Sequence, residues 1–195
     1  MRGVERIPWL YDAWCAFSER LGLARWRRWL VAGADGLVLD IGCGTGRNLP
    51  LYASRAHVVG LEPCAETLAR ARRRAPATPL IQGDAEALPF RSGVFDTVVS
   101  GLVFCSVTDP ARGLAEVRRV LRPGGTLRML EHVRATRPWK ARLQDRGQPA
   151  WTWLTGGCRW NRDTEAAVQR AGFDIEAEGR RTRGDMRRFV ARPRP

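Results

Sequence analysis

The chain has no long hydrophobic run. No apolar stretch in its 195 residues approaches the roughly 18–20 residues that a membrane-spanning helix requires. The first residues also lack the apolar core of a secretory signal peptide. We therefore expect a cytoplasmic protein, with peripheral contact at a membrane surface as a further possibility. The length is sufficient for one domain with a full hydrophobic core.

Paired cysteine motifs are also missing. The five cysteines are Cys15, Cys43, Cys64, Cys105 and Cys158, an odd number with no C-x-x-C spacing. This distribution argues against a disulfide framework and against a zinc site. The sequence predicts reduced thiols and no bound metal.

Lysine is almost absent, since Lys140 is the only one, yet the net charge is +13. Such an excess of arginine can indicate nucleic-acid binding. The excess lies mainly in the first 30 residues and in the C-terminal third, and it also resembles a codon bias. We therefore favour a solvated basic surface and no nucleic-acid partner, with an anionic membrane surface as an intermediate alternative.

Residues 37–46, LVLDIGCGTG, combine an aliphatic run with alternating glycines. The run is typical of a buried parallel strand that ends in a tight loop. Glycine permits positive φ there and lets a ligand approach the backbone. A helix is expected from about Arg47, with free N–H groups at its start. The pattern predicts a nucleotide-like cofactor on this loop.

The glycine spacing narrows the choice of cofactor. A dinucleotide fingerprint would need a glycine at position 47, where this chain has Arg47. The observed D-x-G-x-G-x-G pattern resembles motif I of the class I S-adenosylmethionine (SAM) methyltransferases.

Strands and helices are expected to alternate from residue 37 to about 132, the pattern of a doubly wound, mostly parallel sheet. Further strands are predicted at 57–62, 79–82, 94–100 and 126–133, with helices at 65–74 and around 114–121. Residues 1–33 are predicted to form a helical cap, and residues 34–195 the main domain. Residues 134–172 are expected to be largely helical, before a strand near 173–177.

All eight tryptophans lie in the two flanks, at positions 9, 14, 26, 29, 139, 151, 153 and 160. Large rings outside the sheet suggest flanks that pack over the cofactor edge as an apolar wall or lid. Ordinary packing of helices on the sheet explains many of them equally well. Trp26 and Trp29, flanked by arginine, are also compatible with a lipid interface.

One acidic residue ends the second predicted strand and another follows the third. Glu62 can accept hydrogen bonds from both ribose hydroxyls of an adenosine cofactor. Asp84 can accept from the adenine amino group. Either acid could instead be an ordinary solvent-exposed carboxylate, but together with the glycine loop they form a more specific pattern.

The resemblance extends over residues 37–133. LDIGCGTGRN, GDAEALPF, FDTVV and EVRRVLRPGG are similar to the methyltransferase domain of the ubiquinone/menaquinone-biosynthesis type. A further likeness, over roughly residues 37–175, is to the methyltransferase-like-7 subgroup of alkyl thiol methyltransferases and its bacterial relatives. It rests on VFCSV, EHV, Gln144, Pro149 with Trp151, and Gly157-Cys158 with Arg162. This resemblance implies a seven-stranded Rossmann-like fold with SAM as cofactor. The cofactor-binding positions it implies are Asp40, Gly42, Cys43, Gly44, Gly46, Glu62, Pro63, Asp84, Ala85 and Ser100.

His132 follows Glu131 at the end of the fifth strand, where it could accept a proton near neutral pH. A structural histidine is at least as plausible, and we expect no sharply defined catalytic residue. The resemblance predicts methyl transfer to a small hydrophobic acceptor, with a thiol favoured. Phospholipid N-methylation and quinone-type C- or O-methylation are the enzymatic alternatives. A SAM-binding or RNA-associated protein without catalysis is the non-enzymatic alternative.

Overall fold

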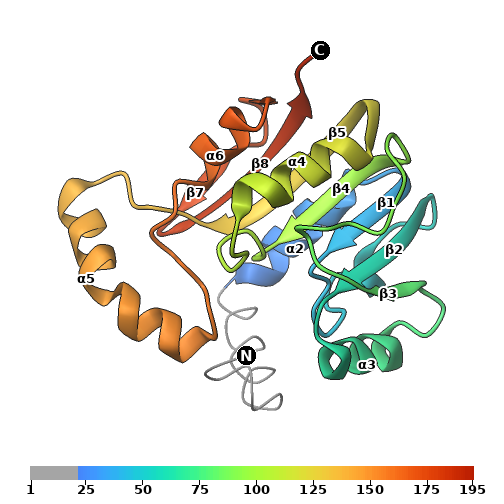
Figure 1. Cartoon of the computed structure of the whole chain (residues 1–195), viewed down its shortest axis with the longest axis horizontal. Helices are drawn as coiled ribbons and strands as arrows, with labels where there is room; N and C mark the ends of the chain where they lie inside the picture. The colour runs from blue at the N-terminus through green and yellow to red at the C-terminus, as the bar shows by residue number, and fades with distance from the viewer. Residues whose placement is uncertain (1–21) are drawn as a thin grey trace.

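The apolar runs of the sequence form one mixed sheet (Figure 1). The computed structural model describes residues 22–195. The order of the strands is β3-β2-β1-β4-β5-β8-β6, and β7 pairs with β8. The strands are β1 (Gly36–Ile41), β2 (Ala56–Glu62), β3 (Leu80–Gln82), β4 (Phe95–Gly101), β5 (Leu121–His132), β6 (Phe173–Ile175), β7 (Arg181–Arg183) and β8 (Met186–Pro193).

Strands β1 to β5 pair with one another in parallel. Strand β8 is antiparallel to each of its three partners, β5, β6 and β7. The order reverses between β1 and β4, and ligands of such sheets bind beyond the carboxyl ends of the strands at this switch point. The predicted doubly wound, mostly parallel fold is confirmed. The sheet has eight strands instead of seven because the short β7 adds to β8.

Helices cover both faces of the sheet, with α4 in front of it and α2 behind it in Figure 1. The helices are α2 (Ala24–Ala32), α3 (Ala65–Arg74), α4 (Pro110–Val120), α5 (Pro138–Thr155), α6 (Thr164–Arg170) and the 3-10 turn η3 (Leu49–Leu51). In the described range no helix is long and apolar enough to cross a membrane.

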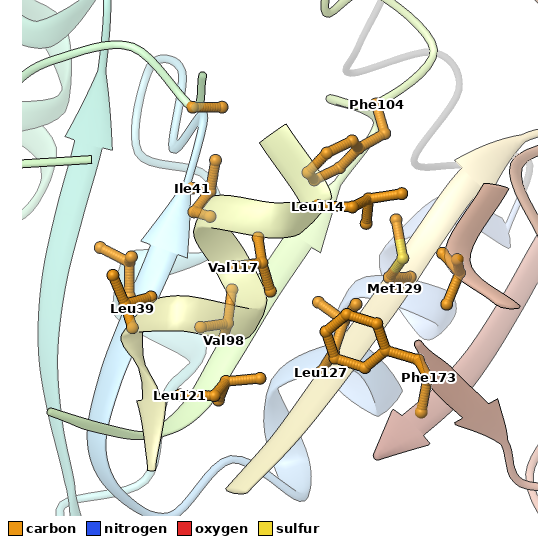
Figure 2. Close-up of a cluster of buried hydrophobic side chains, with 14 of the residues drawn as sticks. Leu39, Ile41, Val98, Phe104, Leu114, Val117, Leu121, Leu127, Met129 and Phe173 are labelled. Atoms are coloured by element: carbon orange, nitrogen blue, oxygen red, sulfur yellow. The ribbon is translucent and has the colours of Figure 1, made fainter. Parts of the chain in front are cut away.

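The main hydrophobic core lies between the sheet and α4 (Figure 2). Leu39 and Val98 point from β1 and β4 towards Leu114 and Val117 of α4, and all four are fully buried. Alternate residues point to the other face, as the two-residue period of a strand requires. There Val38 packs with Leu30 of α2. Burial on both faces explains why the strands are apolar at successive positions.

The helix α2 belongs to this second face of the sheet. The guanidinium of Arg128 on β5 donates to the carbonyls of Leu30 (2.6 Å) and Trp29 (2.7 Å), at the C-terminal end of α2. Arginine in this position satisfies carbonyls that the helix itself leaves unpaired. Arg188 stacks over Trp26 and Trp29, with its guanidinium 5.4 and 4.4 Å from the ring centroids. The two rings therefore pack against the body of the protein, as the helix-packing alternative predicted.

The helix predicted from about Arg47 does not form. The chain instead makes only η3, which has Pro50 in its first turn, and then enters β2 at Ala56. The connection is too short for a helix of several turns, and Tyr52, which follows η3, donates its hydroxyl to Asp40 (3.0 Å). The glycine loop is therefore not followed by the dipole of a long helix, and the N–H groups of Cys43, Gly44 and Gly46 donate within the protein.

A buried acid orders the segment that follows β4. The fully buried carboxylate of Glu131, on β5, accepts four hydrogen bonds. The donors are the Ser100 hydroxyl (2.9 Å) and the backbone N–H groups of Val103, Phe104 and Cys105 (3.0, 3.1 and 3.2 Å). Burial raises the pKa of Glu131, and these four bonds to the carboxylate oppose that rise.

The same segment is held on its carbonyl side by Arg162. Its guanidinium donates to the carbonyls of Phe104 and Val107, both at 2.6 Å. Residues 103–107 are thus fixed between an acid that accepts their N–H groups and a base that donates to their carbonyls. Backbone groups that would otherwise be buried without partners are satisfied in this way.

We predict that Glu131→Leu lowers the free energy of unfolding by about 3 kcal/mol or more, because four donors lose their acceptor in a buried site. Urea unfolding followed by circular dichroism measures the change. Glu178→Gln, at an exposed position, is the control and should stay within about 0.5 kcal/mol of the native protein. Equal stability of the Glu131→Leu protein and the control would show that the network contributes little.

Candidate functional site

A cavity of about 500 Å³ opens at the carboxyl ends of β1, β2 and β4. Its position matches the switch point of the sheet, and its size is within the range of small-molecule sites. Its walls come from the glycine loop after β1, the end of β2, the turn after β3 and the segment after β4. The lining residues are Ile41, Gly42, Gly44, Thr45, Leu61, Glu62, Pro63, Cys64, Thr67, Asp84, Ala85, Glu86, Gly101, Leu102, Val103, Ser106, Val107 and Thr108.

Gly44 forms the part of the glycine loop nearest to open space. Its φ of +58° lies in the left-handed region. Among residues 22–195, apart from its chain neighbours, only the Gly42 carbonyl oxygen lies within 4 Å of where a Cβ would be, at 3.9 Å. A ligand can therefore contact the backbone here, in space that any side chain would fill.

Glu62 fixes the loop and also faces the cavity. One carboxylate oxygen accepts the Gly44 N–H and the other accepts the Cys64 N–H, both at 3.1 Å. Burial raises the pKa of Glu62, and these two bonds oppose the rise. Each oxygen has further acceptor capacity, so the carboxylate can also accept hydrogen bonds from the hydroxyls of a bound ribose.

Asp84 and Ala85 line the opposite side of the cavity. One oxygen of Asp84 accepts the Glu86 N–H at 2.9 Å, which holds the turn after β3. The Asp84 side chain is otherwise exposed, and Ala85 is buried. This turn places an acceptor at the cavity edge, where the sequence predicts contact with adenine. Of the ten predicted cofactor positions, six line the cavity: Gly42, Gly44, Glu62, Pro63, Asp84 and Ala85.

The other four predicted positions lie behind the cavity wall. Asp40 is fully buried and holds the Tyr52 hydroxyl; burial raises its pKa to about 7. Ser100 bonds to Glu131. Cys43 packs towards α3, and burial raises the pKa of its thiol. Gly46 allows close contact with α3, since a Cβ would lie 3.0 Å from Ala71 Cα.

These four residues support the wall from behind, and direct contact between any of them and the cofactor stays a prediction.

The segment after β4 forms the other end of the cavity. The resemblance predicts that Gly101 and Leu102, beside Ser100, line its floor, and both do; the rest of the segment was missed. Leu102 has a φ of +65°, an unusual value for a residue with a side chain, and it turns the chain out of the sheet. Val103, Ser106, Val107 and Thr108 then follow along the wall. The VFCSV motif was the only signal for this segment, because neither charge nor glycine spacing marks it.

Within residues 22–195 the tryptophans do not form the predicted cavity wall. None of the six within the described range lines the cavity, while Trp9 and Trp14 lie outside that range. Trp151 stacks on Trp160, with centroids 4.4 Å apart. Nor does any residue of 22–33 line the cavity, so this part of the predicted lid is a helix packed on the sheet; residues 1–21 lie outside the described range.

His132 lies beside the cavity wall, within a cluster that the sequence did not reveal. Its Nδ1 is 3.5 Å from the Cys158 sulfur, and the Cys105 sulfur is 3.7 Å from the Ser106 hydroxyl oxygen. Hydrogen bonds from Cys105 and His132 lower the pKa of Cys158, against the effect of burial. Cys105 and Cys158, far apart in the sequence, are therefore brought together, and His132 does not line the cavity as a general base would.

Comparison with known proteins agrees with this site. Residues 39–129 match a family described as a methyltransferase domain. The human thiol S-methyltransferase TMT1B is 34% identical over 159 residues, which cover 76% of this chain and 65% of that protein. The phosphatidylethanolamine N-methyltransferase of Cereibacter sphaeroides is 41% identical over 108 residues, which cover 52% of this chain and 53% of that protein. This chain therefore spans less than two thirds of the length of these relatives.

The fold also matches solved structures. A SAM-dependent methyltransferase of Thermotoga maritima has a TM-score of 0.74 at 22% identity, with 96% of each chain covered. The open position at Gly44 and the acceptor capacity of Glu62 fit the cofactor that this fold binds. Residues 39–129 therefore carry a methyltransferase domain, and the sheet has the Rossmann-like fold of the class I, SAM-dependent methyltransferases.

Proposed function

We propose that this protein transfers the methyl group of SAM to a small hydrophobic acceptor, and that the acceptor atom is a thiol sulfur. One observation carries the proposal: the end of the cavity formed by residues 101–108 is largely apolar and has no titratable side chain among the described lining residues. Leu102, Val103 and Val107 supply apolar surface there, and Ser106 and Thr108 supply only hydroxyls.

Because this end of the cavity has no base among its described lining residues, it favours an acceptor that ionises by itself. When bound, SAM supplies an electrophilic methyl group, so the protein needs mainly to align a deprotonated nucleophile and to exclude water. A thiol with a pKa of about 8.5 is roughly 3% ionised at pH 7. An ammonium group with a pKa of about 10.4 is only roughly 0.04% deprotonated.

The relatives are named for different acceptors. Thiol S-methyltransferases from human, rat and mouse are 31–34% identical to this chain over 144–159 residues. A phosphatidylethanolamine N-methyltransferase and a demethylmenaquinone methyltransferase of Renibacterium salmoninarum are 41% and 40% identical over 108 and 118 residues. Because the longer matches are to thiol enzymes, they support sulfur over the phospholipid and quinone-type alternatives.

We also propose peripheral contact with an anionic membrane, through the outward face of α5. Figure 1 shows this helix set apart from the sheet. Four large apolar side chains on it are exposed: Trp139 (58%), Leu143 (62%), Trp153 (71%) and Leu154 (42%). At the 100° spacing of a helix these four share one face, opposite the buried Ala141 and Gln144.

The charge beside this face identifies the partner that we propose. Lys140, Arg142 and Arg146 are exposed on the same helix. An apolar face with tryptophan, bordered by basic residues, is the pattern of a helix that lies in the interface of an anionic bilayer. Such a surface would also bring the cavity close to hydrophobic acceptors dissolved in lipid.

We predict that the pH dependence of methylation follows the acceptor and not the protein. With an alkyl thiol, kcat/KM should rise about tenfold per pH unit below the thiol pKa and then level off. With a more acidic aromatic thiol the same profile should shift to lower pH. Labelled SAM and a panel of thiols, a quinol and phosphatidylethanolamine provide the measurement.

Methylation of the amine or the quinol without methylation of any thiol would overturn the proposed acceptor. SAM binding without turnover of any acceptor would favour the non-catalytic alternative. A salt-dependent gel shift with RNA tests the remaining alternative, an RNA-associated protein.

We predict that Glu62→Ala weakens SAM binding by about 1–3 kcal/mol, since an acceptor of buried hydrogen bonds is lost. Calorimetry of the folded variant measures this change. Glu66→Ala is the matched control, because Glu66 lies on α3, is exposed and does not line the cavity. Unchanged affinity in the Glu62→Ala protein would remove Glu62 from the cofactor site.

We predict that the double variant Leu143→Glu/Trp153→Glu loses about tenfold or more of its affinity for phosphatidylserine-containing vesicles in a sedimentation assay. The native chain should bind these vesicles more strongly than neutral phosphatidylcholine vesicles. Leu51→Glu, at an exposed leucine outside α5, is the control and should bind as the native chain does. Unchanged vesicle binding by the double variant, or a dimer of the native chain that this variant abolishes, would contradict the membrane proposal.

A further inference from the structure

Three soft metal-ligating side chains meet beside the cavity. Cys105 lies between β4 and α4, His132 is the last residue of β5, and Cys158 lies between α5 and α6. The two sulfur atoms and a ring nitrogen of His132 all lie within 4.8 Å of one another. Both cysteines are buried, and His132 keeps part of its surface accessible. The fold thus gathers three ligands from three separate segments.

The spacing fits a tetrahedral ion. In protein zinc sites Zn–S is about 2.3 Å and Zn–N about 2.0–2.1 Å, which at a tetrahedral angle places sulfur and nitrogen about 3.5 Å apart. The Cys158 sulfur and His132 Nδ1 are 3.5 Å apart in this structure. One position between the atoms can therefore satisfy the distances to Cys158 and His132, and the Cys105 sulfur, within 4.8 Å of both, reaches the same position by a shift of its side chain.

We propose that Cys105, His132 and Cys158 bind one Zn²⁺ ion next to the acceptor end of the cavity. Two thiolates and one imidazole are a ligand set that Zn²⁺ prefers over Mg²⁺ or Ca²⁺. The two thiolate charges balance that of the ion, so the complete site is neutral and its burial is electrostatically acceptable. Three protein ligands leave the fourth position to a small ligand such as water.

The surroundings hold the ligands in place, as metal sites require. Glu131 accepts the Cys105 N–H at 3.2 Å, and the Cys105 carbonyl accepts the Arg159 N–H at 2.7 Å. Gln148 donates to the Cys158 carbonyl at 3.0 Å. The indole N–H of Trp151 has no conventional partner among the described residues, and it is close enough to Cys158 to act on its sulfur.

An ion at this place would act on the cavity through Ser106. The Ser106 hydroxyl, which lines the cavity, is 3.7 Å from the Cys105 sulfur. Coordination of Cys105 would tie the wall of residues 103–107 to β5 and to the segment after α5. We therefore expect zinc to stabilise the acceptor end of the cavity, whatever acceptor is used.

The test uses the full chain, purified under reducing conditions, depleted of metal by a chelator and titrated with Co²⁺. We expect one equivalent to bind with thiolate-to-cobalt absorption in the near ultraviolet and intense visible bands of a tetrahedral ion, both removed by Zn²⁺. Cys105→Ser, Cys158→Ser and His132→Gln should each weaken cobalt binding by more than about 100-fold. Cys64→Ser, a cysteine outside the cluster, should still bind one equivalent.

Zinc should also raise the unfolding temperature of the native chain but not that of the His132→Gln variant. Because these readouts do not involve methyl transfer, they are independent of the proposed function. The proposal is overturned if the reduced native chain, folded by circular dichroism, gives no thiolate–cobalt absorption. It is equally overturned if mass spectrometry of protein isolated without reductant shows Cys105 joined to Cys158 in a disulfide and the reduced form binds no zinc.

Discussion

The buried carboxylate of Glu131 is the interaction on which the rest of the site depends. A parallel sheet leaves a crevice at its switch point, but a crevice becomes a binding cavity only if the loops around it have fixed positions. Glu131 fixes the loop after β4 by accepting three of its N–H groups, and Arg162 fixes it by donating to two of its carbonyls. A charged group satisfied by backbone dipoles imposes one geometry, because any other would leave the charge or the dipoles buried without partners.

The same principle operates on the cofactor side of the cavity with Glu62. Its carboxylate joins the glycine loop to the end of β2 through two backbone N–H groups. Both ends of the cavity are thus organised by an acid on a strand that accepts backbone donors from a neighbouring loop. The two acids differ in the acceptor capacity that they have left for a ligand. Glu131 is fully buried, whereas Glu62 faces the cavity and can accept further hydrogen bonds. One carboxylate therefore serves structure alone, and the other can serve structure and binding together.

Most of the sheet and the cofactor half of the site could be predicted from sequence, because their signals are local. An aliphatic run followed by alternating glycines specifies a strand and a tight turn, Glu62 ends β2, and Asp84 lies in the turn after β3. The prediction of a helix after Arg47 was wrong. The length of the connection that contains Pro50 is known only once the start of β2 is known, and it is too short for such a helix. The cluster of Cys105, His132 and Cys158 could not be seen, since its members are brought together only by packing between β5 and the segments after β4 and α5.

The cavity has two chemically different halves, one polar and one apolar. The half near Gly44 and Glu62 presents carboxylates and an open glycine backbone, which suit a polar cofactor. The half near Leu102 and Val107 presents apolar side chains on a single loop segment. Because that segment is held mainly through its backbone, its side chains can change without loss of the hydrogen bonds that position it. Substitution of the lining residues Leu102, Val103 and Val107 would therefore change this half of the cavity while the half near Gly44 and Glu62 is kept.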